Sequence, residues 1–252
     1  MNRAKLLTIV MLTMMLGACA SVPQQPVAFD AGAIAGSGNH VAIQMKKIPA
    51  TDTTFPGAGC LMCIGAARLF HSDLSAQVQS LQPEDLNALP DRLAKVLRDN
   101  GAQVSVLDQP EDISSLPSNA AKGENQKLSE KDFRPLADKL GVDKLLVLDI
   151  RGQGVKRAYS SYIPTDIPRA YVSGIAYMVD LKTNTYVWYS AIETARPAEG
   201  EWNEPPSFPG LTNAYYQVQA ETSDSLTSEL SVNATKTSKA SPLTETTAKV
   251  TQ

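Results

Sequence analysis

The sequence predicts an α/β domain built on a single mixed β-sheet with packed helices, in the order β-α-β-α-β-β-β-α. Three observations support this prediction. Short apolar segments recur between segments whose apolar residues are spaced three and four apart. Two long strand-like segments, residues 170–181 and 185–192, are separated only by a short polar turn. The 252 residues are 43% hydrophobic and 19% charged, a balance with which a chain of this length can bury one substantial core.

The N-terminus has the pattern of a secretion signal. Arg3 and Lys5 precede an apolar run over residues 6–16, which is shorter than the roughly 20 residues of a membrane-spanning helix. The next four residues resemble the lipobox of bacterial lipoproteins: Leu16, Gly17, Ala18 and Cys19. The resemblance implies that residues 1–18 are a signal peptide and that Cys19 begins the mature chain and carries lipid, with palmitate among its acyl groups. The alternatives are an uncleaved membrane helix and an ordinary signal with an incidental cysteine.

The residues after the cysteine indicate to which membrane the chain is sorted. In the lipoproteins that this motif resembles, the absence of an aspartate after the cysteine points to the outer membrane, and this chain has Ala20 and Ser21 there. The resemblance therefore implies the periplasmic face of the outer membrane. Two or three acyl chains, at about 0.8 kcal/mol per buried methylene, bind far more strongly than one chain, so we expect permanent attachment.

Two flanking segments lack the pattern of a folded core. Residues 19–38 are rich in proline and glycine, which predicts a flexible tether, and residues 231–252 lack aromatics, which predicts a disordered tail. The folded periplasmic domain is expected over residues 39–230. Removing the signal takes two of the 23 basic residues and none of the 26 acidic ones, which leaves 21 against 26 and a net charge of −5. This balance predicts no nucleic-acid partner.

The first half of the domain alternates strands and helices. Apolar and polar residues alternate over residues 41–45, which predicts the first strand. A proline, two acids and spaced leucines predict a helix over residues 83–97, in which Pro90 is expected either to kink the helix or to restart it. Residues 104–107 are predicted to form a second strand, and residues 109–126 a polar loop.

The second half begins with a helix predicted over residues 129–140. Ser129 and Asp132 resemble a capping box, and Gly141 is expected to end the helix. The nearly continuous apolar residues 144–150 then predict a strand in the middle of a sheet that is covered on both faces.

The chain continues with a bend or bulge expected over residues 152–154, and then with the hairpin already described. Residues 197–209, which are rich in proline, are expected to be irregular, and apolar spacing predicts a last helix over residues 212–230.

Two segments carry a resemblance to a known family. Residues 137–149 (Ala-Asp-Lys-Leu-Gly-Val-Asp-Lys-Leu-Leu-Val-Leu-Asp) lead through a leucine-glycine step into a strand, and residues 177–188 (Tyr-Met-Val-Asp-Leu-Lys-Thr-Asn-Thr-Tyr-Val-Trp) carry an aspartate, a turn and a tryptophan. They resemble the periplasmic lipoproteins related to the curli secretion channel, over about residues 41–230. That family includes pore formers, cell-wall synthase activators and transporter accessory lipoproteins, so a shared fold does not choose the function. Pro164 and Pro168 interrupt the place of a pore-forming hairpin, and no pore is expected.

Cys60 and Cys63 form a C-x-x-C motif in the apolar segment 57–67. Their spacing allows a disulfide if the segment is helical, and the alternatives are a redox pair and two buried thiols. His71 would supply a third zinc ligand, but a structural zinc site uses four, so no metal is expected. We expect the segment to fill the core; contact with lipid or with a partner is the alternative.

No catalytic residue and no cofactor are expected. A hydrolase would have to use His40 or His71, and the Gly-x-Ser-x-Gly motif is absent from the sequence. Asp149, Asp180 and Glu193 fall in predicted strands, where carboxylates are usually solvated or paired.

The predicted function is therefore a non-enzymatic binding or assembly module of an envelope complex, attached to the membrane through Cys19, with a protein partner of unknown identity. One alternative is a thiol-disulfide redox protein that uses Cys60 and Cys63. Another is a homo-oligomeric component that resembles the secretion channel.

Overall fold

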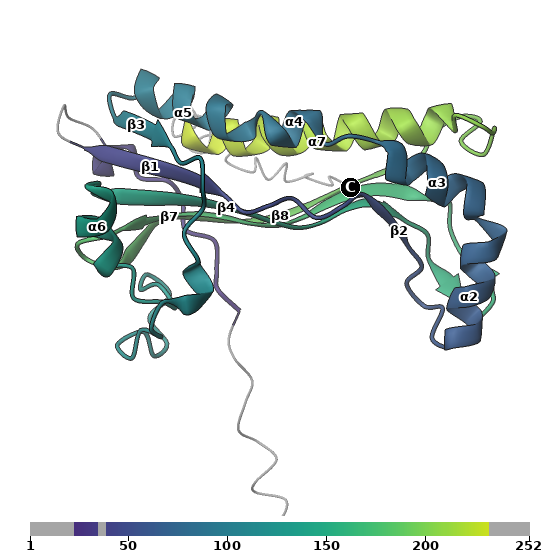
Figure 1. The fold of residues 1–252 in the computed structure, drawn as a ribbon, viewed down its shortest axis with the longest axis horizontal. Coiled ribbons are helices and arrows are strands. Elements are labelled where there is room, and N and C mark those ends of the chain that lie inside the picture. Colours follow the sequence, from purple (N-terminus) through teal and green to yellow (C-terminus); the bar gives the residue numbers. More distant parts are fainter. Residues whose placement is uncertain (1–22, 35–38, 232–252) are drawn as a thin grey trace, which may run out of the picture.

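The computed structural model describes residues 23–34 and 39–231 (Figure 1). The predicted signal peptide, the lipobox with Cys19 and the tail beyond Ser231 lie outside the described residues. The described chain forms one six-stranded mixed sheet with helices packed on it, which confirms the predicted fold class. The strands follow the order β3-β1-β4-β7-β8, and β2 pairs with β4 beyond the end of β1.

The main sheet contains β1 (His40–Met45), β2 (Asp52–Thr54), β3 (Gln103–Val106), β4 (Lys144–Lys156), β7 (Arg169–Asp180) and β8 (Thr185–Pro197). β1 pairs in parallel with β3 and β4, whereas β4, β7 and β8 are antiparallel. A separate small hairpin joins β5 (Tyr159–Ser160) to β6 (Ile163–Pro164).

The helices are α2 (Leu61–Phe70), α3 (Ser72–Ser80), α4 (Glu84–Asn87), α5 (Leu89–Asp99), α6 (Pro135–Leu140) and α7 (Pro209–Leu230), with short 3₁₀ turns η2 (Ala31–Ala33) and η3 (Ile113–Ser115). Figure 1 shows α4, α5 and α7 lying along one face of the sheet. α2 and α3 lie at one end of the sheet, and α6 lies at the other end (Figure 1).

The sheet buries side chains on both faces because neighbouring residues of a strand point in opposite directions. In β4, Leu146 and Leu148 belong to the large cluster under α5 and α7. Leu145 and Val147 belong to a second cluster with Phe133 and Leu136 on the opposite face. The prediction that this strand is covered on both faces is therefore confirmed.

The structure decides two predictions about where helices begin. α5 begins anew at Leu89, with Pro90 in its first turn, so the restart and not the kink is correct. The capping box predicted at Ser129 is wrong. The Ser129 hydroxyl donates to the carbonyl oxygens of Lys131 and Asn184, and the helix begins only at Pro135. Gly141 ends it in the left-handed conformation, with φ of 64°, as predicted.

Residues 23–34 differ from the free tether that their composition predicts. Val27 exchanges two backbone hydrogen bonds with Tyr189 of β8, at 2.9 and 3.0 Å, and Ile34 is fully buried in the large core cluster. A few apolar residues among prolines and glycines are sufficient to hold this segment in place, because strand β8 of the body supplies its backbone partner. The chain is therefore held to the body from about Gln24 onward, where a side-chain amide bonds the carbonyl oxygen of Gln126 at 2.7 Å.

Candidate functional site

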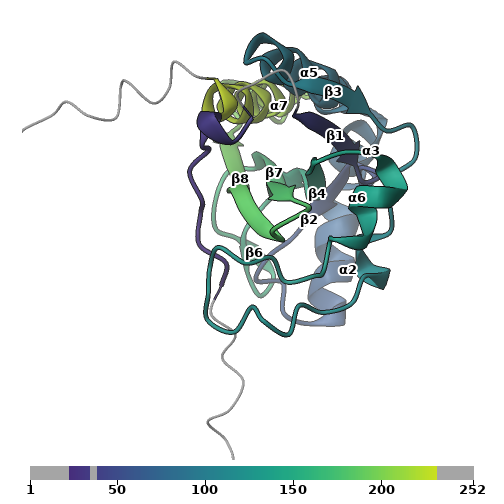
Figure 2. The same ribbon diagram turned by 90° about the vertical axis from the view of Figure 1, so that its left-hand side faces the viewer.

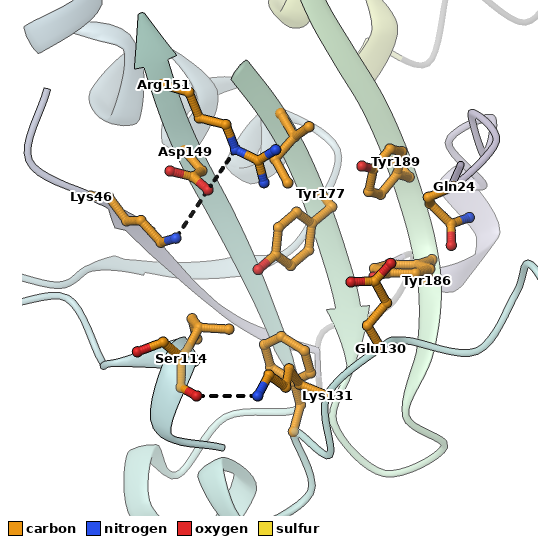
Figure 3. A pocket seen from close by; sticks show the side chains of 13 residues that line it. Gln24, Lys46, Ser114, Glu130, Lys131, Asp149, Arg151, Tyr177, Tyr186 and Tyr189 are labelled. Carbon is orange, nitrogen blue, oxygen red and sulfur yellow. Dashed lines mark hydrogen bonds and ion pairs between the residues drawn. The ribbon is translucent and has the colours of Figure 1, made fainter. Parts of the chain in front are cut away.

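A cavity of about 280 Å³ lies on the face of the sheet opposite α5 and α7 (Figure 3). Strands β4, β7 and β8 form its floor, and the segment between β3 and α6 forms one wall. We call it the tyrosine pocket. It is lined by Gln24, Lys46, Ile113, Ser114, Glu130, Lys131, Phe133, Asp149, Arg151, Ile175, Tyr177, Tyr186 and Tyr189.

Strand register and one irregularity bring the three tyrosines together. Tyr177 pairs with Tyr189 across β7 and β8. Simple alternation would place Tyr186 and Tyr189, three residues apart, on opposite faces. The pairing shifts where Val179 meets Tyr186, and this bulge turns both rings to the pocket side.

The tyrosine rings form a compact cluster. The rings of Tyr177 and Tyr189 are nearly parallel, with centres 6.1 Å apart, and the ring of Tyr186 meets both edge-on at 5.7 and 5.3 Å. Burial raises the pKa of Tyr186 to about 12, and burial together with the neighbouring Tyr186 and Asp149 raises the pKa of Tyr177 well above its usual value. At neutral pH both hydroxyls are therefore protonated. The Tyr177 hydroxyl points into the cavity (Figure 3).

A charged group lies beside the tyrosines. The Asp149 carboxylate accepts hydrogen bonds from Lys46 Nζ at 3.0 Å and from Arg151 Nε at 3.2 Å (Figure 3). The Asp149 side chain is 12% exposed, whereas that of Arg151 is 59% exposed. One carboxylate thus meets two cations, and the outer nitrogens of Arg151 are bonded by nothing else in the described part of the chain.

The N-terminal segment completes the wall. Gln24 Oε1 accepts a hydrogen bond from Lys122 Nζ at 2.7 Å, and Lys122 also donates to the carbonyl oxygen of Leu128. Lys131 Nζ donates to the carbonyl oxygens of Ser114 and Leu116, so two of its three N–H groups hold the wall. The pocket therefore offers hydroxyl groups, aromatic faces and the exposed guanidinium of Arg151, with Lys46, Glu130 and Lys131 as further charged groups in its lining.

A second feature is an uncovered apolar surface at the other end of the sheet. Leu61, Met62, Leu69 and Phe70 of α2 are between 77% and 89% exposed. Tyr162 and Ile163 of the small hairpin are also exposed. We call these six residues the apolar tip. Covering the four side chains of α2 would contribute roughly 6–12 kcal/mol before the costs of association.

The expectation that residues 57–67 fill the core is wrong for most of the segment. Only Ala58, Cys63 and Ala67 are buried, in a small cluster with Tyr159. The sequence does not reveal this because apolar residues occupy almost every position of α2, so no polar face marks the solvent side.

Cys60 and Cys63 are joined by a disulfide in the structure, with Cα atoms 5.0 Å apart. Cys60 is exposed just before α2, and Cys63 is buried one turn later. The sulfur of Cys63 lies 3.7 Å from the hydroxyl oxygen of Ser161, and that of Cys60 lies 3.7 Å from the Tyr162 hydroxyl oxygen. The bridge therefore sits where the small hairpin contacts the start of α2.

His71 lies between α2 and α3 and is not near enough to other ligands to bind zinc. Within residues 23–34 and 39–231, no group of three His, Cys, Asp or Glu side chains is placed to hold a metal ion. His71 Nε2 lies 2.7 Å from the Tyr159 hydroxyl oxygen and 3.0 Å from Arg157 Nη1. Because the guanidinium can only donate, Nε2 accepts and the imidazole is neutral.

This arrangement predicts a pH dependence of stability. Burial, and secondarily the charge of Arg157, lower the pKa of His71 below its ordinary 6.5. The stabilising contribution is therefore full above the unfolded-state pKa and is lost as the pH falls through the lower folded-state pKa. The wild type should lose more unfolding free energy than His71→Gln between about pH 7.5 and about pH 5, measured by urea denaturation. Equal losses in the two chains would show that His71 is not held neutral.

The structure brings together residues that the sequence did not single out. Asp149, Asp180 and Glu193 were expected to be solvated or paired; Asp149 proves to be the centre of the charged group in the pocket. The sequence gives no signal for Lys46, because this residue follows β1 and lies 103 residues from Asp149 along the chain. Arg151 likewise has no motif that marks it. The sequence feature that could have indicated the pocket is the enrichment of tyrosine over residues 171–189.

Comparisons with known proteins give low similarity. No protein-family model and no curated protein sequence matches the chain. Among solved structures, the fold is similar to a neuraminyllactose-binding hemagglutinin homolog from Helicobacter pylori, with 12% identity, a TM-score of 0.36, and coverage of 86% of this chain and 91% of the other.

Two other solved structures are also similar. A PelC dodecamer from Paraburkholderia phytofirmans has 12% identity and a TM-score of 0.27 over 79% of this chain and 95% of the other. Lipoprotein GNA1162 from Neisseria meningitidis has 12% identity and a TM-score of 0.27 over 72% and 99%. Identities and TM-scores this low carry neither a function nor a partner to this chain.

Proposed function

We propose that this chain is a non-enzymatic lipoprotein, attached through Cys19 to the periplasmic face of the outer membrane, that binds a protein of an envelope complex through the tyrosine pocket. The lipobox pattern supports the anchor. Gln24, in the pocket wall, follows Cys19 by five residues, so the wall lies within roughly 18 Å of the acylated residue even if the intervening chain is fully extended.

The observation that carries the binding function is the chemistry of the tyrosine pocket. Rings packed at fixed angles give apolar contact at little entropic cost, and protonated hydroxyls can donate to or accept from a ligand. The two outer nitrogens of Arg151 can donate to a carbonyl oxygen, or to both oxygens of a carboxylate through two parallel hydrogen bonds. A polypeptide segment that combines an apolar side chain with such oxygens fits this set of groups.

The experiment places a photo-crosslinking amino acid at Ser114, on the pocket wall, in intact cells. Arg151→Gln removes the accessible guanidinium and leaves Asp149 paired with Lys46. Lys95→Gln is the matched control, because Lys95 is an exposed cation on α5, on the opposite face of the sheet. We expect Arg151→Gln to reduce the crosslinked species by about tenfold and Lys95→Gln to leave it unchanged. Equal crosslinking in all three chains would contradict binding through the pocket.

A second candidate function is thiol-disulfide exchange. The specific observation is that Cys60 is exposed at the start of α2 while Cys63 is buried, since a helix N-terminus can stabilise a thiolate. Free-thiol titration should show whether the bridge opens under mild reductant. An exchange activity that disappears in the chain with both Cys60→Ser and Cys63→Ser would favour the enzyme and contradict the non-enzymatic function. We expect no such activity, and pocket crosslinking that persists in the double variant.

A further inference from the structure

We propose that the apolar tip docks on the lipid bilayer, so that the body is held to the membrane at a second place besides its N-terminus. The tip is distant from the tyrosine pocket: it lies at the end of the sheet where α2 and the small hairpin project (Figure 1). None of the helices in the described part is both long and apolar enough to cross a bilayer. The contact we infer is therefore with the surface layer of the membrane, where an apolar helix face enters between headgroups.

The face of α2 that points away from the body is apolar except for Arg68, which lies seven residues from Leu61 on the same side of the helix. Cys63 and Ala67 face the body and are buried. Leu61 and Leu69, eight residues apart, share a face on the other side of the helix, with Gly65 between them. Met62 lies beside this row and is 77% exposed. Nothing in the described chain covers these side chains.

The charges around the tip favour lipid over a protein partner. From residue 53 to residue 72 the only formally charged side chain is that of Arg68, and residues 158–165 carry no charge. Burying a carboxylate in lipid is costly, whereas an arginine can extend its charged end to the headgroups. A protein interface usually has a rim of mixed polar and charged groups. Around the tip such groups are few: Arg68 lies on α2, and Asp73 and Arg157 border it only on the side of Phe70. Tyr162 supplies an aromatic side chain of the kind enriched at membrane surfaces.

The position of the tip agrees with the proposed anchor. Figures 1 and 2 both show α2 projecting to the side of the sheet opposite α5 and α7. The described N-terminal segment, drawn in purple, leaves the body toward that same side. A bilayer that holds Cys19 can therefore meet α2 without a change in the fold. This step rests on the proposed attachment through Cys19.

The tip is also held firmly enough to act as a fixed contact. The disulfide joins the residue before α2 to its first turn, and both sulfurs contact the small hairpin. Gly57 has a φ of 86°, and a side chain there would collide with the carbonyl oxygen of Tyr159. The two segments of the tip are therefore packed directly against each other through their backbones.

The test uses the full lipidated chain in vesicles of phosphatidylethanolamine and phosphatidylglycerol. A tryptophan replaces Leu61 or Leu69, and fluorescence is compared between ordinary lipids and lipids brominated along the acyl chains, which quench only at contact. Val106→Trp is the matched control, since Val106 is a partly exposed apolar residue on the edge strand β3. Trp188 and Trp202 are common to all chains, so their emission is measured in the wild type and subtracted from that of each variant.

We expect brominated lipid to reduce the added emission by about twofold or more at Leu61→Trp and Leu69→Trp and not at Val106→Trp. Quenching at the tip that is no greater than at Val106 would overturn the proposal. A dimer in detergent that dissociates when Leu61→Asp and Leu69→Asp are combined would also overturn it, because a second copy would then cover the tip. Failure of the anchor is distinguishable, since a chain without acyl groups would be released from the vesicles on washing, whether or not the tip is quenched before the wash.

Discussion

Gly174→Ala is expected to lower the free energy of unfolding by about 3–5 kcal/mol. Gly174 lies in β7, opposite Ile150 of the central strand β4. An added Cβ would overlap the carbonyl oxygen of Asp149 and lie 2.9 Å from the Cα of Ile150. These are backbone atoms of β4 within its pairing with β7, so they cannot move without loss of ladder hydrogen bonds between the two strands. Urea denaturation of the purified chain measures the change.

Gly65→Ala provides the control for this prediction. Gly65 lies in α2, and an added Cβ there meets nothing within 4 Å. Because alanine favours a helix over glycine, the free energy of unfolding should stay the same or rise by up to about 1 kcal/mol. If Gly174→Ala unfolds at the same urea concentration as the wild type, the close approach of β4 and β7 does not exist as described.

The same close approach matters for the pocket. The pairing of β4 with β7 shifts between Ile150 and Gly152, which are the residues on either side of Arg151. Asp149 and Arg151 thus reach the pocket from a strand whose path depends on a glycine in its neighbour. Gly174 therefore links the stability of the sheet to the geometry of the charged group.

The central elements were predictable because local pattern and tertiary role agree. The apolar segment from Lys144 is the central strand, and the glycines at 152 and 154 mark an irregular stretch of one long strand. The predicted order omits α2, α3, β2 and the small hairpin of β5 and β6. α2 has apolar residues on nearly every side, so its sequence has no helical stripe, and β2 is only three residues long. β2 is defined by its long-range pairing with β4 and not by local propensity.

The candidate site was less predictable than the fold. The tyrosines were visible as a composition bias, but their common orientation depends on a bulge in β8 for which the sequence shows no pattern. The capping box expected at Ser129 failed because its hydroxyl bonds the carbonyl oxygen of Asn184, 55 residues away. In each case the deciding partner is distant along the chain.

Cys19→Ser is expected to abolish acylation completely. The lipobox resemblance implies a thioether on the cysteine sulfur, and a serine hydroxyl does not replace that nucleophile. Without acyl chains, only the apolar tip would contact the membrane, and the chain should pass into the soluble periplasmic fraction on washing. Cys60→Ser is the matched control: it removes a cysteine outside the lipobox and should leave the chain on the membrane.

Attachment through Cys19 is the claim on which both the proposed function and the docking of the apolar tip depend. Metabolic labelling with radioactive palmitate tests it most directly, because it detects the lipid itself and not the location of the chain. The wild type and Cys60→Ser are predicted to carry label, and Cys19→Ser to carry none. An unlabelled wild type, or label retained on Cys19→Ser, would contradict a lipid anchor at this residue.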